Sequence, residues 1–150
     1  MIDEIYMHEA LKIAKEAYVQ DEVPVGAVIV FENQIIAKAH NQVEMLHDPT
    51  AHAEMIAITQ ATNALSCKWL QACTMYVTIE PCSMCAGALV LSRIKQVYFG
   101  AEDPKTGACG SILNIANHTK LNHSFEIQSG LLREKCSELM SKFFQQKRKK

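Results

Sequence analysis

The sequence predicts an α/β protein of three layers, α/β/α, in which a central mixed five-stranded sheet is flanked by helices. Three observations predict this class. Segments with helical spacing of apolar residues alternate with single short runs of β-prone residues. A helix between two successive strands implies a crossover connection, and therefore parallel strands. Two β-prone runs near the N-terminus are close enough to form an antiparallel hairpin, which makes the sheet mixed.

The N-terminal segment predicts a helix followed by the hairpin. Apolar residues recur at helical spacing from Asp3 to Val19, and the helix should end before the turn at residues 21–24. The two strands are predicted at Gly26 to Phe31 and Ile35 to Ala39, with the polar residues 32–34 between them.

The middle of the chain predicts a second helix and a third strand. The helix should cover Ala51 to Asn63, with Asp48 as its N-cap and Pro49 at its first helical position. Thr74 to Ile79 alternates and is rich in β-branched residues, which indicates a strand that ends before Pro81.

The last part of the chain predicts two more helices and two more strands. A helix rich in Ala, Leu and Met should run from Cys82 to Ser92, followed by a strand at Gln96 to Gly100. Residues 100–110 have the composition of a loop. A final strand is predicted at Phe125 to Gln128 and a final helix at Leu131 to Lys147.

The composition is that of a globular protein. Of the 150 residues, 49% are apolar and 21% are charged, so disorder is not expected. This length permits one sizeable core, and we expect a single domain over residues 1–150 with a basic helix end at 141–150. No apolar run approaches the roughly 20 residues that span a bilayer, and Met1 to Tyr6 do not resemble a secretory signal. We therefore expect a cytoplasmic protein.

A reducing compartment affects how the six cysteines are interpreted, because it disfavours disulfides and favours metal binding or chemistry. Four of the cysteines share no motif spacing, and we interpret them as small buried hydrophobic residues: Cys67, Cys73, Cys109 and Cys136. Only Cys82 and Cys85 form a motif.

The charge is unevenly distributed. The formal net charge is −1, but residues 141–150 contain five cations and no acid, so residues 1–140 carry −6. The cations are Lys142, Lys147, Arg148, Lys149 and Lys150. One interpretation is a focused contact with an anion such as a phosphate backbone. The other is a solvated helix end whose cations complement the helix dipole.

The chemistry is predicted by two short motifs. Cys82 and Cys85 lie three residues apart at a helix N-terminus, where they share a face and where the dipole favours thiolate. Alone, this spacing fits a redox pair, half of a structural zinc site or a catalytic metal site. His52 begins another helix, so two strand-to-helix transitions could converge at one edge of the sheet.

One imidazole and two thiolates would neutralise Zn²⁺ and leave a fourth position for water, the open arrangement of catalytic zinc. Glu54 lies two residues from His52, so it is poorly placed to ligate but could act on the water as general acid and base. A structural site would instead need a fourth protein ligand. Four residues stay open for that role: His40, His47, Cys73 and His123.

The sequences His52-Ala53-Glu54 and Pro81-Cys82-Ser83-Met84-Cys85 resemble the signature of the zinc nucleoside and nucleobase deaminases. The likeness extends to residues 22–27, 47–54, 99–101 and 105–107, and in these it resembles the bacterial tRNA-specific adenosine deaminases of the cytidine/deoxycytidylate deaminase-like superfamily.

The resemblance implies that a zinc-activated water, with one zinc per subunit, converts the wobble adenosine of a tRNA anticodon loop to inosine. It implies zinc ligation by His52, Cys82 and Cys85, proton transfer by Glu54, and a homodimer. It also implies a set of substrate contacts: Asn41, the backbone of Ala53, Asp103, Lys105, Lys147 and Arg148. The chain departs from the family at Gln42 and Val43, where the family often has Arg and Pro, and this puts the local loop contacts in doubt.

Two other functions remain open. A deaminase of free cytosine, guanine or a nucleotide would use the same fold and zinc site, although a small base does not need the basic end. A noncatalytic zinc-stabilised RNA-binding module would not need an acid beside an open zinc site.

Overall fold

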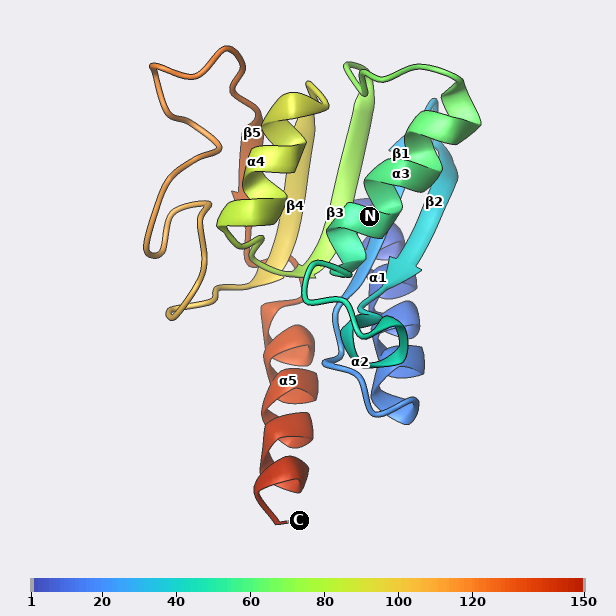
Figure 1. The fold of residues 1–150 in the computed structure, drawn as a ribbon, viewed down its shortest axis with the longest axis vertical. Coiled ribbons are helices and arrows are strands. Elements are labelled where there is room, and N and C mark those ends of the chain that lie inside the picture. The colour runs from blue at the N-terminus through green and yellow to red at the C-terminus, as the bar shows by residue number, and fades with distance from the viewer. Residues whose placement is uncertain (1, 150) are drawn as a thin grey trace.

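The computed structural model describes residues 2–149 and contains five strands and five helices in that part of the chain (Figure 1). In chain order they are α1 Ile2–Val19, β1 Gly26–Phe31, β2 Gln34–His40, α2 Val43–Leu46, α3 Ala53–Leu65, β3 Cys73–Ile79, α4 Ser83–Leu91, β4 Gln96–Ala101, β5 Glu126–Ser129 and α5 Arg133–Arg148. No helix among these residues is long and apolar enough to cross a membrane.

The five strands form one mixed sheet in the order β2-β1-β3-β4-β5. β1 is antiparallel to both of its neighbours, β2 and β3, whereas β4 and β5 continue parallel to β3. Four strands therefore point the same way, and their carboxyl ends lie at one edge of the sheet. This confirms the predicted hairpin and the predicted mixed sheet.

Helices cover both faces of the sheet, as the fold class predicts (Figure 1). Because side chains alternate along a strand, Val28 and Val30 of β1 pack in one cluster with Met7 of α1. Ala27 and Ile29 of the same strand pack on the opposite side, in the cluster that contains the alanines of α3. Cys136 of α5 joins the α1 side, so α1 and α5 form one outer layer and α3 and α4 the other.

The second helix begins later than predicted. Its N-cap is His52 and not Asp48, so the helix starts at Ala53. The carboxylate of Asp48 instead accepts hydrogen bonds from the backbone N–H of Thr50 at 2.8 Å and from its hydroxyl at 2.7 Å. Asp48 thus closes a local turn, a use of aspartate that competes with helix capping. The short helix α2 was not predicted from the sequence.

The four cysteines outside the motif do not all behave alike. Cys73, Cys109 and Cys136 are buried, as predicted, and Cys73 and Cys109 belong to the larger core cluster. The prediction is wrong for Cys67, which is exposed. Cys67 follows Ser66, the left-handed residue that ends α3, and therefore lies in the connection to β3 rather than under a helix.

Candidate active site

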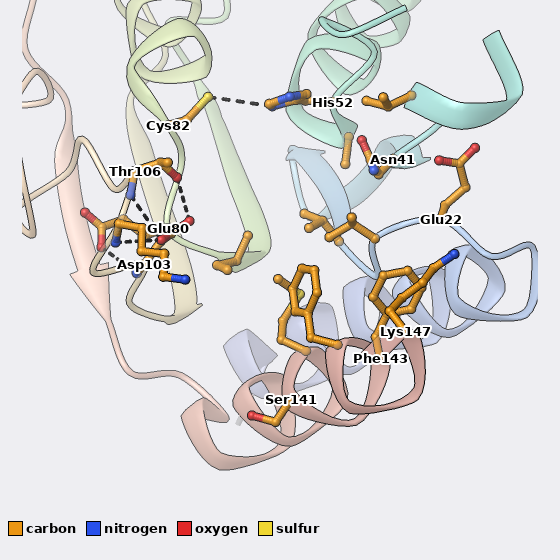
Figure 2. Close-up of a pocket in the computed structure, with 18 of the residues that line it drawn as sticks. Glu22, Asn41, His52, Glu80, Cys82, Asp103, Thr106, Ser141, Phe143 and Lys147 are labelled. Atoms are coloured by element: carbon orange, nitrogen blue, oxygen red, sulfur yellow. Dashed lines mark hydrogen bonds between the residues drawn. The ribbon is translucent and has the colours of Figure 1, made fainter. Parts of the chain in front are cut away.

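A pocket of about 1090 Å³ opens at the edge of the sheet where the parallel strands end (Figure 2). Five segments contribute to its lining: the turn after α1, Asn41 after β2, the starts of α2 and α3, and the segment from Ile79 to Cys82 at the end of β3. Residues 102–106 form a further wall. The C-terminal half of α5 crosses the side opposite His52 and Cys82 (Figure 2).

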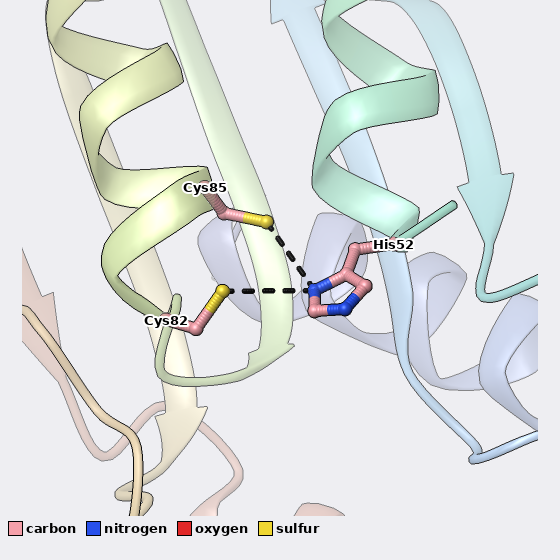
Figure 3. Close-up of side chains that lie close together, drawn as sticks. All are labelled: His52, Cys82 and Cys85. Atoms are coloured by element: carbon pink, nitrogen blue, oxygen red, sulfur yellow. Dashed lines mark hydrogen bonds between the residues drawn. The ribbon is translucent and has the colours of Figure 1, made fainter. Parts of the chain in front are cut away.

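Three side chains in this region could hold a metal ion. The ligand atoms of His52, Cys82 and Cys85 lie within 4.8 Å of one another, and both sulfur atoms are 3.6 Å from Nδ1 of His52 (Figure 3). His52 and Cys82 are the extended N-cap residues of α3 and α4, and Cys85 lies one turn into α4. The two helix starts that the sequence predicts to converge are therefore brought together.

The protonation of these groups is coupled. A hydrogen bond from Cys85 lowers the pKa of the Cys82 thiol to about 4, and the bond to His52 acts in the same direction. The pKa of Cys85 is raised, first because it donates to Cys82 and then because it is buried. The hydrogen bond to Cys82 raises the pKa of His52. The group therefore contains one thiolate, that of Cys82, whose negative charge attracts a cation.

Glu54 is a buried acid next to His52 in the pocket lining. Its side chain is 3% exposed, and burial raises its pKa to about 7. It is not a member of the group that could hold a metal. A carboxyl group whose pKa lies near neutrality can both accept and donate a proton, which suits a general acid and base.

Within residues 2–149, none of the four alternative ligands belongs to the group that could hold a metal. Nδ1 of His40 lies 2.9 Å from the carbonyl oxygen of Asn41, and a ring nitrogen of His123 lies 2.7 Å from that of Ile94. Cys73 is enclosed in the core. The described residues thus contain a three-ligand group, the arrangement that leaves a position free for water.

Asn41 and Ala53 both line the pocket. Asn41 follows β2, is 6% exposed, and its backbone N–H donates to the carbonyl of Val25 at 3.1 Å. Ala53 is buried at the start of α3, where no side chain caps the helix. Nearby, the buried carboxylate of Glu22 accepts from the N–H groups of Glu44 at 3.0 Å and Met45 at 2.7 Å. Glu22 therefore fixes the start of α2, a role that sequence reasoning missed.

The loop with Asp103 and Lys105 is a tight turn on the rim of the pocket. Asp103 Oδ1 accepts from the N–H groups of Lys105 at 3.0 Å and Thr106 at 3.1 Å, and Oδ2 accepts from the Thr106 hydroxyl at 2.7 Å. Partial burial raises the pKa of Asp103, but these hydrogen bonds outweigh it and the pKa is lowered. The Asp103 side chain therefore shapes the turn. Glu80, which sequence reasoning also missed, lies beside this loop and accepts a hydrogen bond from the backbone N–H of Asp103 (Figure 2).

Lys147 and Arg148 line the pocket from α5. The ammonium of Lys147 lies 2.8 Å from the Asp21 carboxylate in an exposed ion pair, and Arg148 Nε lies 3.4 Å from the carbonyl of Phe144. Lys142 instead lines a separate groove between α1 and α5. Lys150, also part of the predicted basic end, lies outside the described residues.

One family model and several known proteins resemble the chain. A model of MafB19-like deaminases matches residues 1–148. The tRNA-specific adenosine deaminase of Bacillus subtilis is 50% identical over 148 residues, which are 99% of this chain and 92% of that protein. A chain solved in a study of A-to-I editing by tRNA:A34 deaminases at the wobble position of transfer RNA is 40% identical with a TM-score of 0.87, and the match covers 90% of this chain and 98% of the other. The guanine deaminase of Bacillus subtilis is 42% identical with a TM-score of 0.62, over 66% of this chain and 64% of the other.

Proposed function

The chain belongs to the MafB19-like deaminases, and on that basis we propose that it hydrolyses the wobble adenosine of a tRNA anticodon loop to inosine, with zinc as its cofactor. The observation that carries the proposal is the match to a tRNA-specific adenosine deaminase over 99% of the chain. The buried Glu54 beside the group of His52, Cys82 and Cys85 supplies the chemistry that such a reaction needs.

The donor set fits zinc. One imidazole nitrogen and two sulfur atoms form a borderline-soft site, which disfavours Mg²⁺ or Ca²⁺. Bound by His52, Cys82 and Cys85, zinc supplies a Lewis acid that brings the pKa of a water molecule towards neutrality. Metal analysis of protein purified without added metal tests this proposal. Active protein that contains almost no zinc would refute it.

Glu54 is proposed to move the protons of the reaction. Its carboxylate takes a proton from the attacking water and delivers it to N1 of the purine. It then takes the second proton of that water, from the hydroxyl group now on C6, and passes it to the amine, which leaves as ammonia. A single residue can perform all of these transfers because each proton that the carboxylate accepts is one that it next delivers, which returns it to its starting state. Its burial also keeps competing solvent away from the proton.

Asn41 and Ala53 are proposed to bind the adenine. The amide of Asn41 offers both a donor and an acceptor to the edge of a purine. The backbone N–H of Ala53 lies at a helix start, where it has no partner within the helix and can donate to the substrate. Both residues lie in the same pocket as Glu54, so an adenine held by them would lie next to the acid.

The rest of the pocket is proposed to bind RNA. The bases of an anticodon loop are already partly unstacked, so moving the adenosine into the pocket costs less than from a duplex. Lys105, Lys147 and Arg148 line the rim and would contact phosphates, and Asp103 would lie near the sugar of the flipped nucleotide. We further propose that the protein is a cytoplasmic homodimer whose second subunit completes the RNA groove.

A deaminase of free nucleobases is the alternative. The guanine deaminase of Bacillus subtilis is 42% identical over 66% of the chain, whereas the tRNA-specific relative is 50% identical over 99% of it. A pocket of about 1090 Å³ is also at the upper limit for a site that encloses a small molecule. These observations favour a larger substrate.

The test is to offer the purified protein an anticodon stem-loop with adenosine at the wobble position, and in parallel free adenosine, cytosine and guanine. We expect inosine from the stem-loop and no turnover of the free compounds. Deamination of the free compounds alone would refute the proposal. A Glu54→Gln protein that kept full activity would instead refute the mechanism.

A further inference from the structure

We propose that Glu80 is a positioning residue for the RNA substrate: its buried carboxylate holds the loop of residues 103–111, so that Lys105 meets the RNA in a fixed orientation. This inference rests on the proposed function, because it concerns how the same site recognises its substrate. Glu80 lies between the last residue of β3 and Pro81, and its side chain is 2% exposed.

Four hydrogen bonds fill the carboxylate of Glu80. Oε1 accepts from the N–H of Asp103 at 3.1 Å and from the hydroxyl of Ser111 at 2.5 Å. Oε2 accepts from the N–H groups of Cys109 and Ser111, both at 3.0 Å. A carboxylate has about four acceptor positions, and all are used by one loop. Glu80 is therefore neither available as a metal ligand, consistent with its absence from the metal-binding group, nor free to move protons.

The loop is closely packed on this carboxylate. A Cβ atom at Gly107 would lie 2.4 Å from Cδ of Glu80, so a larger residue there would displace the carboxylate from its hydrogen bonds. The backbone of the loop also bonds to the metal-binding segment, because the N–H of Ala108 donates to the carbonyl of Pro81 at 2.9 Å and Gly107 pairs with Cys82. Glu80 thus fixes the loop against the segment that presents Cys82.

The constraint continues from Glu80 to Lys105. Glu80 holds the backbone of Asp103, and the Asp103 carboxylate holds the backbone N–H of Lys105 at 3.0 Å. Lys105 itself is exposed on the rim of the pocket. Without the Glu80 contacts, the lysine would keep its charge but lose its position, and the phosphate contact would then require ordering of the whole loop on binding.

Glu80→Gln tests this proposal because it keeps the shape of the side chain and changes only its hydrogen bonding. Glutamine has one acceptor oxygen and a donating amide, which would face N–H groups that also donate. We expect the KM for the stem-loop to rise about tenfold or more, since hydrogen bonds to a charged group are among the stronger ones. The kcat should stay within about twofold and the zinc content should be unchanged. Glu126→Gln, at an exposed position of β5, is the control with the same change in charge.

A double-mutant cycle separates positioning from a general loss of structure. If Glu80 acts through Lys105, then Lys105→Gln should raise the KM in the wild-type background and add almost nothing in the Glu80→Gln background. Additive effects on KM, or a fall in kcat alone, would overturn the proposal. Ser111→Ala, which removes one of the four hydrogen bonds at an exposed residue, provides a milder variant, and we expect about a threefold rise in KM.

Hydrogen exchange gives a readout that does not depend on the substrate. In Glu80→Gln, the amides of Asp103, Cys109 and Ser111 should lose protection, while those of β3 should keep it. Unchanged protection of the three amides would overturn the inference even if the wild-type protein proved inactive on RNA. Inactivity of the wild type on the stem-loop, with the loss of protection observed, would overturn the proposed function and the RNA role of Glu80, and would leave only its role in fixing the loop.

Discussion

The salt dependence of RNA binding should be set by a small, known number of cations. Among the described residues, the Lys and Arg side chains that line the pocket are Lys105, Lys147 and Arg148. Each phosphate that a cation neutralises on a single strand contributes a slope of about −0.7 to the plot of log affinity against log salt. Three contacts therefore predict a slope of about −2.1.

This slope can be expressed as a change in affinity. A fourfold rise in salt, from about 50 to about 200 mM, should weaken stem-loop binding about 18-fold in the parent protein and about sevenfold when one contact is removed. Lys147→Gln should have a smaller effect than Lys105→Gln. The reason is that Lys147 is paired with Asp21 at 2.8 Å and must break that pair to reach a phosphate.

The assay is fluorescence anisotropy of a labelled stem-loop across a salt series. Glu54→Gln serves as the parent protein in this series, so that the RNA is not turned over during the measurement. Lys120→Gln is the matched control, because Lys120 is exposed and does not line the pocket. A parent slope near zero, or a loss of slope in the control as large as in Lys105→Gln, would refute the assignment of the pocket rim to phosphate binding.

Three further predictions follow from the site and the core. Glu54→Gln should lower turnover at least about 100-fold while zinc content and stem-loop affinity stay unchanged; loss of zinc would contradict its assignment as a non-ligand. Gly26→Ala should lower the free energy of unfolding by about 1–3 kcal/mol or more, because the new Cβ would lie 2.0 Å from the carbonyl oxygen of Ala10. Denaturation measures this, and Gly87→Ala, with nothing within 4 Å, is the control. The pKa of Asp103 is lowered in the folded protein because its ionised carboxylate accepts the hydrogen bonds of its turn. The ionised carboxylate therefore stabilises the turn at pH values above the pKa of Asp103 in the unfolded chain, and this stabilisation should be lost as the pH falls through the pKa of Asp103 in the folded protein. The protection factor of the Thr106 amide, which compares its exchange with the intrinsic rate at the same pH, should therefore fall at acid pH, and a protection factor that does not change with pH would contradict this.

The fold and the metal-binding group were predictable because their signals are local. Apolar spacing predicts α1 and the strands, and the position of His52 and Cys82 at helix starts predicts their convergence. The N-cap of α3 was predicted wrongly because Asp48 can satisfy either a helix start or a turn, and only the fold decides which N–H groups it reaches.

The buried acids Glu22 and Glu80 could not be recognised from the sequence, although both lie within or beside the motifs. Each accepts hydrogen bonds from residues distant in the chain. The donors to Glu22 are Glu44 and Met45, and the donors to Glu80 follow it by 23 to 31 positions. A glutamate is usually exposed, and nothing in its neighbours along the chain signals that backbone N–H groups will enclose it. The role of such residues can be recognised only from a structure that shows which loops enclose them.

The single antiparallel strand explains why the site opens between α3 and α4. β1 lies between β2 and β3 and runs against both, so the two strands that deliver His52 and Cys82 end at the same edge with one strand between them. At about 4.8 Å per strand, their ends are about 10 Å apart, the distance at which two helices pack side by side. The helix starts can therefore face each other across the end of β1 with the metal-binding group between them. At that end of the sheet, Val25, the residue before β1, lines the pocket between the two helix starts.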